Sequence, residues 1–330
     1  MSAVSGSSPW HTAHRAVLDH VLSLVAHAPW GDGLVLRGSM SMLAWAGADA
    51  RPPGDLDWIA LDRLATPVDE EHPYPHVPSI EVVQQWPEAA AGAARYEFWR
   101  EEEFGTAGSR PHVPPEGLNW VPDLIAYEPH DLRAALIHLF EDRPQAAEGV
   151  VLLADQVDEA GDWAYAGAYG GGAGIRLTVP WQAGEMEPSL LQMDFAGDET
   201  MPDPPVWASV PRADGGPPTP VRAASRESSL AWKLLWLYAD ASDGSGAQAK
   251  DLYDAVLLAE ADQTRLTPHL LNKVLRRSLR EAAGEFCLGA IRVSEEEWSR
   301  FQFAHPAAYG TAQQWLERLG WAVAGSLPVG

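Results

Sequence analysis

The segment 33–61 constrains the fold of this 330-residue chain more than any other stretch. A short apolar run at 33–37 (GLVLR) has the composition of a buried strand, and Gly38 and Ser39 then open a helical stretch. After a Pro-Gly turn, residues 55–61 (DLDWIAL) form a second apolar run of strand type. This order of strand, Gly-Ser turn, helix and strand predicts a mixed α/β arrangement at the start of the chain.

The rest of the chain changes from mixed elements to helices alone. Apolar periodicity predicts helices at 12–28, capped by Thr12, and at 130–141. Strands are expected around 79–84 and at 149–155, 174–180 and 189–196, with the Gly-rich stretch 168–174 as a hairpin loop. The last third of the chain is predicted to form helices at 227–240, 248–261, 267–283, 294–302 and 311–319.

Seven prolines between positions 201 and 220 separate these two parts of the chain. Proline-rich segments are typical of linkers, so we predict a linker or loop at 201–221. The chain is then expected to form an α/β domain at 1–200 and a helical domain at 222–330. Together these parts predict an α+β fold class.

Composition excludes several classes of protein. The chain has 23 Lys and Arg against 46 Asp and Glu, a formal net charge of −23. Such a charge repels nucleic acid on average, which excludes a DNA-coating protein and requires a local basic patch or metal for any nucleic-acid partner. The single cysteine, Cys287, excludes an internal disulfide. Without a membrane-spanning stretch or a signal-peptide pattern, we expect a cytoplasmic protein with no membrane partner.

Two short patterns carry chemistry. Asp55 and Asp57 lie two apart in a predicted strand, so their carboxylates point the same way, and we expect them at the surface. A divalent cation removes the repulsion between such a pair. Gly38 and Ser39 lie where a strand passes into a helix, a position whose N–H groups bind phosphate. Each pattern alone also fits a helix cap or a solvated strand edge; together they favour phosphoryl or nucleotidyl transfer.

The run LRGSMSMLAWAGADARPPGDLDWIAL resembles the first motif of polymerase-β-type nucleotidyltransferases, in particular the AbiEii/AbiGii/MenT group of nucleotidyltransferase toxins. Arg51 stands at the position of a basic residue before the carboxylates. Further on, ESSLAWKLLWLY, with Lys233, resembles the helix in which this group has a lysine. The resemblance covers about 33–61 and 226–260.

A third match follows directly. The run KDLYDAVLLAE resembles the Arg-Asp-x-x-Asp segment of the group, with Lys250 in place of the arginine. Asp251 and Asp254 occupy its acidic positions and share one face of a predicted helix. Asp251 would orient the acceptor or accept its proton, and Asp254 is expected to pair with Lys250 or Arg226. The alternative for both carboxylates is a solvated helical face.

The resemblance implies a polymerase-β-like nucleotidyltransferase domain with a mixed sheet, followed by a helical C-terminal domain. Its cofactor would be Mg²⁺ (or Mn²⁺), held by Asp55 and Asp57, with Asp194 as a candidate third ligand. Asp194 ends an apolar run of strand type, and an ordinary acidic strand end is the alternative for it. Asp198 and Glu199 are lesser candidates.

The substrate would be an NTP, with its phosphates bound by Gly38, Ser39, Arg51 and Lys233. Lys233 lies among leucines at helical spacing, where a buried ammonium needs an anionic partner; a lysine that extends to solvent is the alternative. The catalytic set is therefore Asp55, Asp57, Lys233 and Asp251. Trp232 and Trp236 flank the lysine, with packing as their first role and base stacking as the second.

The resemblance also implies an acceptor and a partner. In the toxin group an NMP is transferred to the 3′ end of tRNA, and the toxin acts with an antitoxin or in phage defence. The one basic helical face holds Lys273, Arg276, Arg277 and Arg280, and it would bind RNA or pair with the acidic surface. The alternatives are transfer to a small hydroxylated molecule such as an aminoglycoside and a non-catalytic nucleotide-binding or interaction module.

Overall fold

The computed structural model describes nine ranges of the chain. They are residues 8–28, 30–60, 98–99, 119–120, 132–160, 174–197, 201–243, 246–279 and 286–326. The strand expected around 79–84 and the loop expected at 168–173 lie outside these ranges, as do Asp198, Glu199 and Arg280.

A mixed sheet forms one half of the molecule. Its strands run in the order β10-β11-β1-β2-β9-β8-β6-β5, and β7 also pairs with β8. β1 and β11 are parallel, as are β2 and β9, and the other pairs are antiparallel. The strands are β1 (Leu34–Arg37), β2 (Leu56–Ala60), β5 (Gln145–Ala147), β6 (Val150–Leu152), β7 (Asp158–Ala160), β8 (Gly174–Ala183), β9 (Ser189–Ala196), β10 (Val206–Val210) and β11 (Thr219–Ala223). A separate parallel pair joins β3 (Phe98–Trp99) and β4 (Asn119–Trp120).

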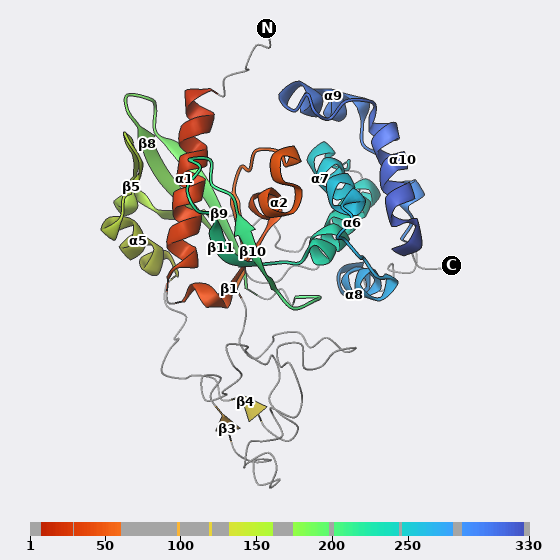
Figure 1. Cartoon of the computed structure of the whole chain (residues 1–330), viewed down its shortest axis with the longest axis horizontal. Helices are drawn as coiled ribbons and strands as arrows, with labels where there is room; N and C mark the ends of the chain where they lie inside the picture. Colours follow the sequence, from red (N-terminus) through yellow and green to blue (C-terminus); the bar gives the residue numbers. More distant parts are fainter. Residues whose placement is uncertain are drawn as a thin grey trace.

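Helices flank the sheet and form the second half of the molecule (Figure 1). They are α1 (Pro9–Ala26), α2 (Gly38–Ala46), α5 (Leu132–Asp142), α6 (Arg226–Asp243), α7 (Ala249–Glu260), α8 (Pro268–Leu279), α9 (Glu295–Ala304) and α10 (Ala312–Val323). The α+β fold class is confirmed. The cap expected at Thr12 is wrong: α1 begins earlier, with Pro9 in its first turn and the Ser8 side chain accepting from the His11 N–H.

The proline-rich segment is not a linker. Residues 206–210 and 219–223 form β10 and β11, which pair with each other over five residues and join the sheet beside β1. Their buried positions alternate, with Thr219, Val221 and Ala223 turned inward. The prediction of a linker or loop at 201–221 is therefore wrong for these two strands.

The two faces of the sheet pack against different cores. Leu36, Trp58 and Met193 lie in a core shared with α1 and α5. Val35 and Ile59 point the other way, into the core that holds α6 and α7. Short α2 contributes to both cores and lies between the sheet and the helices in Figure 1. The face of the sheet toward α6 and α7 is the one that carries charged residues.

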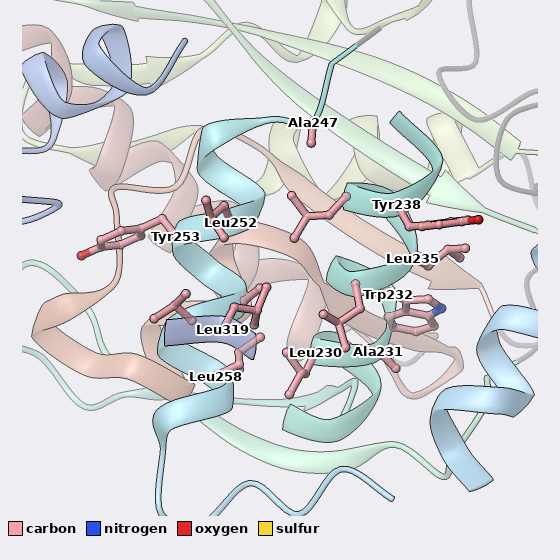
Figure 2. Close-up of a cluster of buried hydrophobic side chains, with 14 of the residues drawn as sticks. Leu230, Ala231, Trp232, Leu235, Tyr238, Ala247, Leu252, Tyr253, Leu258 and Leu319 are labelled. Carbon is pink, nitrogen blue, oxygen red and sulfur yellow. The ribbon is translucent and has the colours of Figure 1, made fainter. Parts of the chain in front are cut away.

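The helical core is built around α6 and α7. Figure 2 shows Leu230 and Trp232 from α6, Leu252 and Leu258 from α7, and Leu319 from α10 in one cluster. All five side chains are buried, so the positions of α6 and α7 relative to each other are set by close packing. Of the helices in the described ranges, none is long and apolar enough to cross a membrane.

Candidate active site

A polar pocket of about 320 Å³ lies where the sheet meets α6 and α7. Four structural units contribute to it: the start of α2, β2 with the loop before it, α6 from Lys233 onward, and the start of α7. The lining residues are Gly38, Ser39, Arg51, Asp55, Asp57, Lys233, Trp236, Asp240, Gln248, Lys250 and Asp251. Four of these are carboxylates and three are cations, so the pocket presents both charges to a ligand.

A row of four charged residues crosses the sheet beside this pocket. Arg37 of β1 pairs in register with Asp57 of β2, which pairs with Asp194 of β9, which pairs with Arg176 of β8. Residues directly opposite each other in a sheet point to the same face, so two carboxylates stand side by side between two arginines. At one end of this row, Arg176 makes two hydrogen bonds to Asp194, of 2.8 and 2.7 Å.

Gly38 allows the backbone to approach Asp57 closely. This residue ends the β1-to-α2 turn with φ +72°, a conformation that glycine adopts at little cost. A Cβ atom placed on it would lie 2.0 Å from Oδ2 of Asp57. The first residue of α2 is therefore packed directly against a carboxylate, where the positive end of the helix favours negative charge.

Asp57 is not the surface carboxylate that the sequence predicts. It is 8% exposed, and burial, reinforced by Asp55, raises its pKa to about 8, while Arg37 acts in the opposite direction. Its neighbour Asp55 accepts a hydrogen bond of 2.9 Å from the Ser39 hydroxyl. A buried carboxylate beside a second one is a costly arrangement, and a divalent cation is the group that relieves it.

The residues present fit a divalent cation through two carboxylates. Asp55 and Asp57 would supply the hard oxygen ligands that Mg²⁺ prefers, and Mg²⁺ commonly takes one or two carboxylates and completes its shell with water and phosphate. Within the described ranges, no group of three or more His, Cys, Asp or Glu side chains is close enough to form a complete cage. Asp194 lies next to Asp57 in register, but its carboxylate is bound by Arg176 and by Gln192 at 3.1 Å.

A second charge network connects α6, α7 and the loop before β2. The Lys233 ammonium donates to Asp251 Oδ1 at 2.6 Å and lies 3.1 Å from Asp254 Oδ2. Arg51 binds the same Asp254 through Nε at 3.2 Å and through its terminal nitrogen at 3.1 Å. The expectation that Asp254 pairs with Lys250 or Arg226 is wrong, because its fully buried carboxylate lies between Lys233 and Arg51.

The ion pairs of this network set its protonation. Burial alone would lower the pKa of the Lys233 ammonium, but Asp251 and Asp254 outweigh it and raise this pKa. Burial opposes ionisation of Asp251, and Lys233 more than compensates, so the pKa of Asp251 is lowered. Lys233 and Asp251 are therefore both charged at neutral pH. The alternative of a lysine that extends to solvent does not apply to Lys233, which is buried.

Most of the predicted site residues meet in the pocket. Gly38, Ser39, Arg51, Asp55, Asp57, Lys233 and Asp251 all line it. Of the basic helical face, Lys273 and Arg276 lie on α8, which is outside this lining; the Arg277 side chain and Arg280 are outside the described part of the chain. The catalytic and binding roles of these residues stay predictions.

Sequence reasoning missed the two arginines of the charged row and two polar residues of the pocket. Arg37 and Arg176 face the carboxylates only through strand register, which cannot be read from isolated motifs. Asp240 and Gln248 lie at the end of α6 and just before α7. The one signal for Arg37 was its position directly before Gly38.

The fold and the pocket define an α+β protein with a charged ligand site between a mixed sheet and a helix that carries a buried lysine. Residues 126–319 match the family described as nucleotidyl transferase AbiEii toxin, type IV toxin–antitoxin system. Because this match spans more than half of the chain, the protein belongs to the AbiEii family. The family makes it a nucleotidyltransferase of a toxin–antitoxin system and implies an antitoxin partner. No curated protein shows significant sequence similarity to the chain.

The matched range contains only one side of the pocket. Lys233 and Asp251 lie inside it, as does Asp194, whereas Gly38 and the two carboxylates at Asp55 and Asp57 precede it. The structure brings this earlier motif to the family's residues through the pairing of β2 with β9 and the packing of α2 against α7. The pocket is therefore the place where the two motifs found in the sequence converge.

Proposed function

We propose that this protein is an Mg²⁺-dependent nucleotidyltransferase that moves an NMP from an NTP to the 3′ end of tRNA. One observation carries the proposal: a single pocket unites the Gly38-Ser39 helix start, the Asp55–Asp57 carboxylates, and the Lys233–Asp251 pair. These are the three components that nucleotidyl transfer needs, namely a phosphate site, a cation site and a group that handles the acceptor proton. We further propose that the catalytic domain has the polymerase-β-like fold.

The phosphates would be bound by the start of α2 and by Lys233. The first N–H groups of α2 have no partner within the helix, and Ser39 supplies a hydroxyl beside them. An ammonium group has three N–H donors, and Asp251 and Asp254 account for two of them. The third donor of Lys233 is the one that would meet a phosphate oxygen. Arg51, which also lines the pocket, would add positive charge.

Asp55 and Asp57 would hold Mg²⁺, with Asp194 as a further ligand if Arg176 releases it. When bound, the cation supplies charge neutralisation at the phosphates during transfer. Ser39 orients Asp55 through its hydrogen bond, and Gly38 keeps the space in front of Asp57 open. Ser39 and Gly38 would therefore both act by positioning a carboxylate.

Asp251 would accept the proton of the attacking hydroxyl. In the transfer step a bond forms between the acceptor oxygen and the α-phosphorus, the bond to the bridging oxygen breaks, and pyrophosphate leaves with the electron pair. Lys233 lowers the pKa of Asp251 in the free protein. A phosphate bound by Lys233 draws on the same positive charge, so Asp251 becomes a better base when the nucleotide is present.

The first test of this proposal is a transfer assay. The purified protein is incubated with Mg²⁺, total tRNA and each α-labelled NTP in turn. Label on tRNA with the wild-type protein, and none with Asp57→Asn, is the expected result. Asp19→Asn is the matched control, because Asp19 is also a buried carboxylate but lies on α1 and is absent from the pocket lining. Label only on a small hydroxylated acceptor would overturn the tRNA assignment. No label on any acceptor would overturn the proposal that the protein transfers nucleotides.

The second test addresses the acceptor. If tRNA binds along α8, the double variant Lys273→Ala/Arg276→Ala should lower transfer to tRNA while the affinity for NTP is unchanged. Removing two phosphate contacts should also reduce the salt dependence of tRNA binding, by a slope of about two. Arg300→Ala is the control, since Arg300 is an exposed basic residue on α9 that already pairs with Glu296 and Glu297. Unchanged tRNA transfer in the double variant would exclude α8 as the RNA site.

A further inference from the structure

The two tryptophans of α6 have different environments. Trp232 is 5% exposed and belongs to the helical core (Figure 2). The Arg37 guanidinium carbon lies 5.7 Å from the centroid of its ring. Trp236, one turn later, is only half-buried and lines the pocket. Packing in the core therefore accounts for Trp232, whereas Trp236 packs against the core and also lines the pocket.

Trp236 offers the pocket its one large apolar surface. The other lining residues are glycine, serine, glutamine or charged, so Trp236 is the single aromatic residue among the lining residues that the structure describes. A site for phosphates and a cation has no use for an indole ring. A nucleobase does, because every base has a flat π-face that stacks on an aromatic side chain and loses water-exposed surface there.

The position of Trp236 on α6 matches the geometry of a nucleotide. Lys233, Trp236 and Asp240 follow each other at spacings of three and four residues, so they share one face of the helix. From Lys233 to Asp240 this face runs about 10 Å along the helix axis, which is the scale of one nucleoside. A triphosphate bound at Lys233 would therefore place its base further along the same face, at Trp236.

A direct contact joins the phosphate-binding group to the ring. The Lys233 ammonium lies 5.1 Å from the centroid of the Trp236 ring, a distance at which cation–π attraction operates. Because Asp251 and Asp254 fix the ammonium, this contact restrains the ring as well. The indole is thus preorganised beside the lysine, which reduces the ordering cost of binding a base against it.

We propose that Trp236 is the nucleobase platform of this site: the base of the NTP stacks on its indole ring while the triphosphate binds at Lys233 and the start of α2. This inference rests on the proposed function, since it assigns the base subsite of the same pocket. Stacking is tolerant of base identity, so Trp236 contributes affinity for all four nucleotides. Asp240, in the last turn of α6, and Gln248, just before α7, also line the pocket and supply polar groups to it.

The experiment compares a nucleotide with a ligand that lacks the base. Dissociation constants are measured by calorimetry with Mg²⁺ for four α,β-methylene NTP analogues and for inorganic tripolyphosphate. In Trp236→Leu, affinity for the NTP analogues should fall roughly 10- to 100-fold and affinity for tripolyphosphate should stay unchanged. Trp236→Phe, which keeps an aromatic face, should restore most of the loss. Trp207→Leu, at a tryptophan that is 69% exposed on edge strand β10, is the matched control.

A second measurement needs no variant. The wild-type protein should bind an NTP analogue roughly 10- to 100-fold more tightly than ribose 5-triphosphate, which has the sugar and phosphates but no base. Equal affinity for the two ligands would overturn the platform, as would a Trp236→Leu protein that binds the NTP analogues like the wild type. Equal losses for NTP analogues and tripolyphosphate would show that Trp236 acts only through Lys233. A wild-type protein that binds neither would instead overturn the proposed function itself.

Discussion

At the scale of single residues, the site depends on the missing side chain of Gly38. We predict that Gly38→Ala removes transferase activity, because the new Cβ would lie 2.0 Å from Asp57 Oδ2 and displace that carboxylate. The free energy of unfolding should fall by about 1–2 kcal/mol for the left-handed backbone and by about 1–3 kcal/mol more for the clash. Urea unfolding measures the loss of stability, and the transfer assay measures the loss of activity.

Gly149→Ala separates these two effects. Gly149 has the same φ of +72° but nothing within 4 Å of a Cβ placed on it, so this variant carries the backbone cost alone. It should lose about 1–2 kcal/mol and keep its activity. If both glycine variants lose activity equally, the close approach of Gly38 to Asp57 is not what the site requires.

The burial of Asp57 predicts a dependence of stability on pH. An aspartate in the unfolded chain has a pKa of about 3.9, and in the folded protein the pKa of Asp57 is raised to about 8. Below about pH 4, Asp57 is protonated in both the folded and the unfolded state. Between about pH 4 and pH 8 the unfolded chain releases its proton first, so this group makes the free energy of unfolding fall as pH rises.

The side chain of the Asp57→Asn variant is uncharged at every pH. Its free energy of unfolding should therefore not fall between about pH 4 and pH 8 through this group. Without divalent cations, the variant should gain stability over the wild type from pH 5 to pH 8, by an amount on the order of a few kcal/mol. Urea unfolding at the two pH values measures it. A stability difference that does not change with pH would contradict the buried, cation-free carboxylate. The sequence identified Asp57 correctly but not its burial, because α2 and the charged row that enclose it come from distant positions.

At the scale of elements, helices and long strands were predictable from their periodicity, and short strands near prolines were not. All five C-terminal helices agree with α6 to α10 within a few residues. β10 and β11 span five residues each, too short for their alternation to outweigh the proline count. Pro220 is tolerated because it lies on the exposed side of β11, which meets β1 in register only at Ala223.

The junction of α6 and α7 is predicted to be stabilised by its ion pairs. Lys233→Met leaves two buried carboxylates, Asp251 and Asp254, with Arg51 bound to Asp254 alone. Breaking a buried pair in this way should cost about 3–5 kcal/mol of unfolding free energy. Adding Asp251→Asn removes the uncompensated charge, so the double variant should recover much of that loss in urea unfolding and still fail to bind NTP.

This double variant distinguishes structure from function. Recovered stability without recovered binding means that Lys233 serves the ligand as well as the fold. Lys233→Met with wild-type stability would contradict the buried network. Recovered NTP binding in the double variant would remove Lys233 from the phosphate site, leaving Arg51 and the start of α2 to hold the triphosphate.

At the scale of the whole molecule, the pocket lies at the boundary between two hydrophobic cores. Gly38 and Asp57 belong to elements anchored in the sheet, whereas Lys233, Trp236 and Asp251 belong to helices anchored in the second core. The sequence identified both groups as motifs. Their meeting depended on the parallel pairing of β2 with β9, across a separation of more than 130 residues, which no local pattern specifies.

A ligand that fills this pocket should therefore stabilise both cores at once. At a concentration 100-fold above its Kd, a ligand adds about 2.7 kcal/mol to the free energy of global unfolding. We predict that Mg²⁺ with an α,β-methylene NTP analogue slows amide exchange in α2 and β2 as well as in α6 and α7, while α9 and the exposed strand β10 keep their rates. Hydrogen exchange followed by mass spectrometry measures this, with Asp57→Asn as the control that should show little protection. Protection confined to α6 and α7 would mean that the ligand contacts the helical core alone, and it would exclude Gly38, Ser39 and the two carboxylates from the nucleotide site.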